Sequence, residues 1–353
     1  MHSHPFGNLR TGEPVEAIML KNHSGASLRF ITLGGIVTSL CVPDREGRTA
    51  DVVLGFDRLE PYLAPHPYFG AIVGRVAGRI PGGRFTINEK TCQLVQNDGP
   101  NHLHGGLRGL DKRIWNAAPV KRTDGADSVR LTYRSPDGEE GHPGNVDLAV
   151  TYTLTGDNVF IIESEAVSDR ATPVSLTHHS YFNLAGEGSG DINDHRLIVF
   201  ADHAFAVDEC MTPLARVKSV IGCACDFTSP RRLGDVIPRL FQNHGDLYLL
   251  KQPAHGTLAP AARLADPASG RVLTVSTTES CLQVYTGASL DGSLTGKSGR
   301  PYVRHAAICL ECEGYPGAVE FPEFGSILVQ PGQPVRRMTH YAFSNLSYTQ
   351  NII

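Results

Sequence analysis

Short runs of apolar and β-branched residues recur along the chain, and polar turn residues separate them. In the segment LAVTYTL at 148–154, large apolar residues alternate with Ala and Thr. A period of two places the large side chains on one face of an extended strand, so this segment predicts a half-buried β-strand. Similar β-rich runs occupy residues 28–33, 129–133, 159–163, 272–276, 282–285 and 326–330.

Turn-forming sequences lie between neighbouring runs, for example Pro-Asp-Gly at 136–138 and Thr-Gly-Asp-Asn at 155–158. Gly, Asn and Asp supply the backbone conformations that tight hairpins require. We find no helical pattern longer than about two turns and no internal repeat of roughly 20–50 residues. Strands that follow strands without intervening helices favour antiparallel sheets packed face to face. The pattern therefore predicts an all-β fold, a large antiparallel β-sandwich.

Composition adds the domain count to this prediction. The chain has 353 residues, 41% of them hydrophobic and 19% charged, an ordinary globular balance. Its 37 Gly and 23 Pro residues are spread along the chain and do not collect in a linker. A large all-β domain can contain a chain of this length, so we expect one domain over residues 1–353.

Charge and cysteine usage restrict the partners. The net charge of −4 and the pI near 6.4 give no basic footprint for nucleic acid or an anionic membrane surface. The first residues lack a basic segment followed by an apolar run, and no stretch approaches the ~20 apolar residues of a membrane span. The eight cysteines are scattered and form no paired CxxC framework. We therefore expect a cytoplasmic protein with reduced thiols and no bound metal, whose partner is either a small neutral molecule or another protein.

Three segments carry candidate chemistry. The first is NHLHGG at 101–106, in which two His residues precede a Gly pair that lets the backbone approach a neighbour closely. The second is THHSYFNL at 177–184, which mixes hydrogen-bonding groups with aromatic rings, as sugar sites do. The third is ICLECE at 308–313, in which Glu311 emerges from an apolar strand. Desolvation there raises a carboxyl pKa towards the range useful for proton transfer.

These residues also have plainer interpretations. A loop His is often a surface or hydrogen-bonding group, and Glu311 can lie at the polar edge of a strand. A metal site made of His102, His104, His178 and His179 is a further alternative. Adjacent residues of an extended chain point to opposite faces, which argues against His178 and His179 sharing one ion. The residues alone therefore indicate a β-sandwich that handles carbohydrate.

Taken in order, these and other segments resemble the aldose 1-epimerase (galactose mutarotase) family over nearly the whole chain. The matching segments are LGGIVTSLCVPDREGRTADVVLGFDRLEPYL (33–63), YFGAIVGRVAGRIPGGRF (68–85), NHLHGG (101–106), GHPGNV (141–146), LTHHSYFNLAG (176–186), VYTGASLDG (284–292), CLECEGYPGAVEFPEF (309–324) and PGQPVRRMTHYAFS (331–344). One hexapeptide is a weak signal, whereas eight segments in the family's order are specific.

The resemblance implies a β-supersandwich with a polar, solvent-accessible site on one face. It implies that Glu311 is the general base that takes the proton from the anomeric hydroxyl. It also implies that His179 is the general acid at the ring oxygen, and that Arg79 and His104 hold the sugar. Asp246 is the candidate for the family's substrate-binding Asp.

The implied reaction interconverts the α and β anomers of free aldoses of the glucose and galactose type. Ring opening needs one proton removed from O1 and one delivered to the ring oxygen, and closure reverses these transfers. This chemistry needs no redox cofactor and no metal. Two alternatives are a non-catalytic carbohydrate-binding sandwich and an enzyme of phosphorylated sugars. The second alternative needs several Arg or Lys residues converging on the site.

Some positions depart from the family pattern. Gly78 replaces an Asn, His178 replaces the Asn before the catalytic-type His, and Ala288 replaces another Asn. The region around Gly245 and Asp246 also differs from the family's Asp-His-Asn-Phe. These changes spare the acid and the base but alter hydrogen-bonding groups, so we expect mutarotation with a shifted sugar preference.

Overall fold

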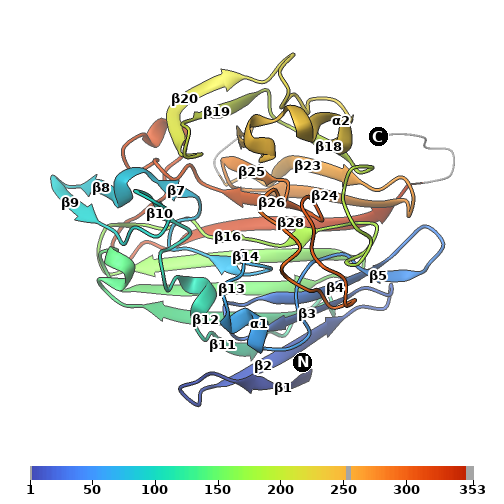
Figure 1. Ribbon diagram of the computed structural model, residues 1–353. Coiled ribbons are helices and arrows are strands. Elements are labelled where there is room, and N and C mark those ends of the chain that lie inside the picture. The colour runs from blue at the N-terminus through green and yellow to red at the C-terminus, as the bar shows by residue number, and fades with distance from the viewer. Residues whose placement is uncertain (1, 252–255, 347–353) are drawn as a thin grey trace.

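The computed structural model describes residues 2–251 and 256–346, and strands dominate them (Figure 1). Three antiparallel sheets of five or more strands make up most of this part of the chain. The nine-stranded sheet has the order β11 (Asn116–Pro119), β12 (Asp127–Ser135), β13 (Val146–Leu154), β14 (Val159–Ser168), β28 (Val335–Asn345), β24 (Arg271–Thr277), β23 (Ala259–Ala265), β18 (Arg196–Val199) and β21 (Arg231–Arg232). The six-stranded sheet has the order β17 (Tyr181–Phe182), β26 (Ile308–Glu313), β25 (Cys281–Tyr285), β22 (Leu247–Leu249), β19 (His203–Val207) and β20 (Pro213–Ser219). The five-stranded sheet has the order β1 (His2–Asn8), β2 (Pro14–Lys21), β3 (Ser27–Ile31), β4 (Val37–Pro43) and β5 (Thr49–Asp51).

Smaller elements connect these sheets. The two-stranded pairs are β7 (Arg79–Ile80) with β10 (His102–Leu103), β6 (Ile72–Val73) with β16 (Thr177–His178), β8 (Arg84–Ile87) with β9 (Lys90–Gln93), and β15 (Thr172–Pro173) with β27 (Leu328–Val329). The α-helices of the described residues are single turns, α1 (Glu60–Leu63) and α2 (Leu233–Val236). No helix in the described part of the chain is long and apolar enough to cross a membrane.

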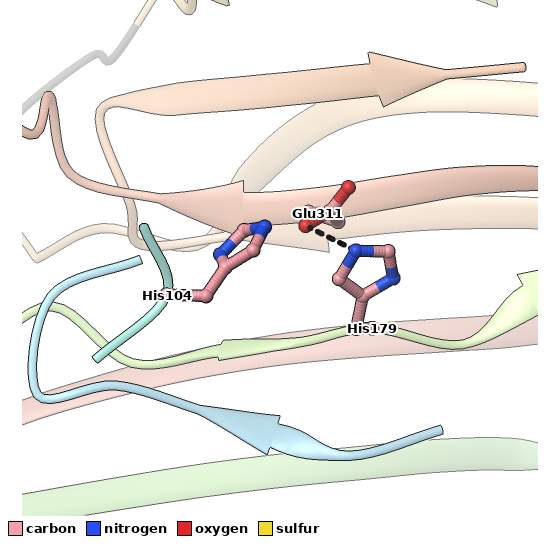
Figure 2. A group of neighbouring side chains, drawn as sticks. All are labelled: His104, His179 and Glu311. Atoms are coloured by element: carbon pink, nitrogen blue, oxygen red, sulfur yellow. Dashed lines mark ion pairs between the residues drawn. The ribbon is translucent and has the colours of Figure 1, made fainter. Parts of the chain in front are cut away.

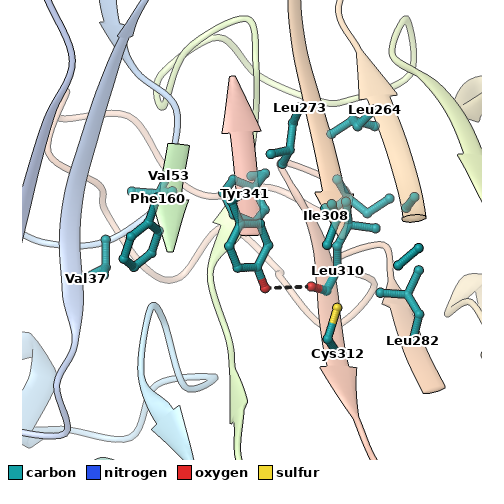
Figure 3. Packing of buried hydrophobic residues seen from close by; sticks show 14 of the residues in the cluster. Val37, Val53, Phe160, Leu264, Leu273, Leu282, Ile308, Leu310, Cys312 and Tyr341 are labelled. Atoms are coloured by element: carbon teal, nitrogen blue, oxygen red, sulfur yellow. Dashed lines mark hydrogen bonds between the residues drawn. The ribbon is translucent and has the colours of Figure 1, made fainter. Parts of the chain in front are cut away.

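The main hydrophobic core lies between the nine-stranded sheet and the other two. Figure 3 shows Phe160 of β14 and Tyr341 of β28 beside Leu310 of β26 and Val37 of β4. The Tyr341 hydroxyl donates a hydrogen bond of 3.0 Å to the Leu310 carbonyl, which satisfies its one polar group inside the core. Fully burying side chains of this size contributes about 1.5–3 kcal/mol each, so this interface holds the sheets together.

The predicted all-β sandwich is therefore confirmed. Each β-rich run overlaps an observed strand, and the run at 148–154 lies inside β13. Leu148, Val150, Tyr152 and Leu154 all belong to the main core, as the period of two predicts. The run at 326–330 is mostly loop, because only Leu328–Val329 pair with a neighbour.

The same alternation along β26 places one set of its side chains in the main core and the other set at the functional site. Ile308, Leu310 and Cys312 point into the main core. The alternate residues Cys309, Glu311 and Glu313 therefore face the other side of the sheet, and every residue of β26 is buried. Two of these are carboxylates, Glu311 and Glu313, which the strand carries into a cavity on that side.

Candidate active site

A cavity of about 340 Å³ opens on the face of the six-stranded sheet that is turned away from the main core. Arg79, His104, His179 and Glu311 all line it, although they come from four separate segments of the chain. Figure 2 shows the two imidazoles converging on the Glu311 carboxylate from the loop after β10 and from the segment between β16 and β17. The structure thus brings together four of the five site residues that the sequence predicts.

Glu311 lies at the centre of β26, pairs in register with Gln283 of β25, and is 2% exposed. Burial disfavours the carboxylate anion and raises the pKa of Glu311 to about 8, against a smaller opposing effect of the Arg79 charge. The sequence prediction that an apolar strand would desolvate this carboxyl is in accord with this shift.

His179 is held by both its backbone and its ring. Its backbone N–H donates to the Ala71 carbonyl at 3.0 Å, and its own carbonyl accepts from Gly70 at 2.9 Å. Its ring is stacked between Tyr181, at a centroid distance of 5.1 Å, and Tyr68, at 5.8 Å. This packing directs Nε2 to a point 3.5 Å from Oε2 of Glu311. Burial lowers the pKa of His179 to about 3, so the imidazole is neutral at pH 7.

His104 lies in the glycine-rich loop, with a positive φ of 54°. The next residue must be glycine, because a Cβ on Gly105 would lie 1.6 Å from the Gly74 carbonyl oxygen. The Gly78 N–H donates to Nδ1 of His104 at 3.2 Å, so the proton of the neutral ring is on Nε2. Burial, followed by the nearby His179, holds the pKa of His104 well below its usual value. His104 is therefore a neutral hydrogen-bond donor towards the cavity.

Two arginines, Arg79 and Arg304, line the cavity, and the charge of Arg79 acts on Glu311. The Arg79 Nε donates to the Asp98 carboxylate at 2.7 Å, which fixes the guanidinium on β7. The Arg79 side chain is 22% exposed. A guanidinium held in this way has remaining N–H groups available to hydroxyl oxygens.

Asp246 does not join this group, contrary to the sequence expectation. It is absent from the residues that line the cavity, and its carboxylate lies 3.6 Å from the Lys218 ammonium. Asp246 immediately precedes β22, in which Leu247 pairs with the cavity-lining Gln283. Successive side chains of a strand alternate between its faces, so the Asp246 side chain lies on the face opposite to that of Leu247 and Gln283. The structure therefore gives no support to the binding role expected of Asp246.

The cavity is also lined by residues to which the sequence analysis gave no individual role, among them Tyr68, Tyr181, Gln283, Tyr285, His244, Arg304 and Glu313. The place of Glu313 in the cavity could have been predicted from the sequence, because Glu313 follows Glu311 by two residues on the same strand and so shares its face. No sequence pattern predicted that Gln283 and His244 line the cavity, because their positions depend on the pairing of β22, β25 and β26.

The alternative of a metal site made of His102, His104, His178 and His179 is not supported by the structure. The His178 ring packs in the core against Tyr152 and Phe160, and the ring nitrogens of His102 contact Val95 and His142. A different set, His104, His179 and Glu311, has ligand atoms within 4.8 Å of one another. These are the same groups that the acid–base chemistry requires.

The geometry of the cavity is that of an acid–base enzyme of carbohydrates. A buried carboxyl and a neutral imidazole lie 3.5 Å apart in a polar cavity lined with aromatic rings, on an antiparallel β-sandwich. Such a pair can move protons on a polyhydroxylated ligand, whose ring can stack on the aromatic side chains.

Comparison with known proteins agrees with this class. The sequence pattern of the family described as aldose 1-epimerase matches residues 16–342. Galactose mutarotase of Sus scrofa is 43% identical, with 96% of this chain and 97% of that protein covered, and the protein of that name from Rattus norvegicus is 44% identical with the same coverage. The crystal structure of an aldose epimerase homologue from C. elegans has a TM-score of 0.85 at 28% identity, and covers 94% of this chain and 99% of its own.

The chain belongs to the aldose 1-epimerase family. It is an isomerase that interconverts the anomers of free sugars.

Proposed function

We propose that this enzyme binds a free hexose of the glucose or galactose type in the cavity, with the anomeric hydroxyl against Glu311. Glu311 acts as the general base at O1, and His179 acts as the general acid at the ring oxygen. His104 and Arg79 donate hydrogen bonds that hold the sugar. The observation that carries this proposal is the 3.5 Å contact between His179 Nε2 and Glu311 Oε2 inside the cavity.

The Glu311–His179 pair shares a single exchangeable proton. Burial raises the pKa of Glu311 to about 8 and lowers that of His179 to about 3, so in the free protein at pH 7 the proton resides on the carboxyl. The reaction uses the other arrangement, with a carboxylate and an imidazolium. Sugar hydroxyls that donate to Glu311 stabilise its anion, and sugar oxygens that accept from His179 stabilise its cation. Substrate binding therefore favours the reactive form.

Catalysis then needs only proton transfers and one bond rotation. Glu311 takes the O1 proton as the bond between C1 and the ring oxygen breaks, and His179 protonates the ring oxygen. The open-chain aldehyde rotates about C1–C2, and the ring closes on the other face with the two roles reversed. The Tyr68 and Tyr181 rings fix the His179 plane, so the imidazole keeps its direction while the sugar turns.

The sugar preference follows from the polar groups of the cavity. Relatives are named for galactose. Gly78 and Ala288 both line the cavity here and offer no side-chain hydrogen bond. A site without hydrogen-bonding side chains at these two positions discriminates weakly between sugars that differ at the hydroxyls facing them. We therefore expect kcat/KM values for glucose, galactose, xylose and arabinose that are not dominated by galactose.

Polarimetry of freshly dissolved α-glucose and α-galactose tests the proposal. The wild-type protein should speed the relaxation to the same final rotation, and Glu311→Ala should abolish the acceleration. If Glu311→Ala binds sugar as the wild type does and the wild type gives no acceleration with any aldose, the non-catalytic carbohydrate-binding alternative replaces this proposal.

We also place the enzyme in the cytoplasm, in keeping with its eight free cysteines.

A further inference from the structure

Glu313 is a second carboxyl in the cavity, and the proton transfers described above do not use it. It lies two residues beyond Glu311 on the same face of β26, and it is 1% exposed. A strand advances about 3.3–3.4 Å per residue, so the two carboxyl groups leave the sheet roughly 6.8 Å apart. Both line the same cavity.

The Glu313 carboxyl is oriented for a ligand and not for a protein partner. Its Oε2 is buried and has no hydrogen-bond partner among the described residues. An unsatisfied buried polar atom costs about 1–3 kcal/mol, so its retention in a binding cavity indicates a group that a ligand completes. Burial, together with the Glu311 and Glu279 charges, raises the pKa of Glu313 well above its usual value. A neutral carboxyl can both donate and accept a hydrogen bond, as sugar hydroxyls do.

Gly78 makes room for this arrangement. A Cβ at position 78 would lie 3.0 Å from Glu313 Oε1 and 2.6 Å from Pro316 Cγ. The same Gly78 donates its N–H to His104, so the backbone that orients His104 also borders Glu313. Glu313 therefore occupies the part of the cavity next to the position where a side chain is missing.

We propose that Glu313 hydrogen-bonds the hydroxyl across the sugar ring from the anomeric carbon, the C4 hydroxyl of a hexopyranose, and thereby sets the discrimination between C4 epimers. The inference rests on the proposed function, which places the anomeric hydroxyl at Glu311. The C4 carbon is the ring atom opposite C1, and the spacing of the two carboxyls along β26 suits groups at opposite ends of one ring.

The test compares glucose with 4-deoxyglucose in wild type, Glu313→Gln and Glu313→Leu. Gln keeps a group that donates and accepts, whereas Leu fills the space without polar atoms, so both variants are expected to fold. Wild type and Glu313→Gln should lose about tenfold or more in kcat/KM when the C4 hydroxyl is removed, because the buried polar group then lacks its partner. Glu313→Leu should reduce that ratio to about twofold or less. The ratio of glucose to 6-deoxyglucose, which reports another hydroxyl, should stay unchanged in all three proteins.

The outcomes separate this inference from the proposed function. If Glu313→Leu lowers kcat/KM equally for glucose and 4-deoxyglucose, Glu313 is a structural residue and the inference is overturned. If wild type turns over no aldose, the proposed function fails. Calorimetric binding of the same two sugars to wild type and Glu313→Leu then decides the Glu313 contact: a ratio that collapses in the variant supports it, and an unchanged ratio overturns it.

Discussion

Replacing Glu311 by Gln removes the ionisable group at the centre of the cavity while keeping its shape and size. Gln cannot take the anomeric proton, and a positioned general base contributes typically 10²–10⁴-fold to a rate. We therefore expect kcat to fall by about two to four orders of magnitude. The same substitution also changes stability, and in the opposite direction.

The stability effect follows from the carboxyl pKa. Burial raises the pKa of Glu311 from 4.5 to about 8, so the folded protein binds this proton more tightly than the unfolded chain does. Between these two pH values the folded state carries the extra proton, and the free energy of unfolding therefore falls as pH rises. At about 1.4 kcal/mol per pH unit over this interval, the stability lost by the time the pH exceeds 8 is about 5 kcal/mol. Gln has no charge to desolvate and avoids this loss.

Thermal unfolding of wild type and Glu311→Gln at pH 4 and pH 9 measures the effect. We expect nearly equal Tm values at pH 4, where the carboxyl is protonated in both states of the wild type. At pH 9 the variant should be more stable by a Tm difference of about 7 °C, given the unfolding entropy of a chain of this length. Polarimetry on the same samples gives the loss of turnover.

Asp266→Asn is a matched control. Asp266 is also buried, at 2% exposed, but it does not line the cavity. Burial alone would raise its pKa, yet hydrogen bonds from Ser269 and Ala268 outweigh that effect and lower it. This variant should therefore lose stability at neutral pH and keep its turnover. Near-full activity of Glu311→Gln would refute the general-base role, and lower stability than wild type at pH 9 would refute the desolvation argument.

Three further outcomes follow from the same cavity. His179→Asn should lower kcat more than it weakens sugar binding, and equal losses would make His179 a binding residue. The pH profile of kcat/KM should fall above about pH 8, where the buried pair loses its single proton, and fall again towards the His179 pKa of about 3. A decline beginning near pH 6 would contradict this. EDTA should leave the polarimetric rate unchanged, and a loss restored by Zn²⁺ would instead give His104, His179 and Glu311 a metal.

The amino-acid sequence determined the strands, the family and the candidate role of Glu311. Alternation along β13 is a local property, so it predicted which side chains enter the core. Glu311 stands between apolar neighbours, which indicated either a desolvated carboxyl with a raised pKa or a carboxyl at the polar edge of a strand, and its burial in the structure decides for the first. The ordered motifs indicated the aldose 1-epimerase family, which the comparisons confirm.

The tertiary structure decided which of the predicted residues meet. Arg79, His104, His179 and Glu311 converge because β7, the loop after β10, the segment before β17 and β26 are brought side by side by sheet pairing. Asp246 was expected among them and is directed to Lys218 instead. Pairing between distant strands depends on packing over the whole core, and no local pattern encodes it. The direction of a side chain relative to the cavity, and the proton it carries there, therefore appear only when the sheets are assembled.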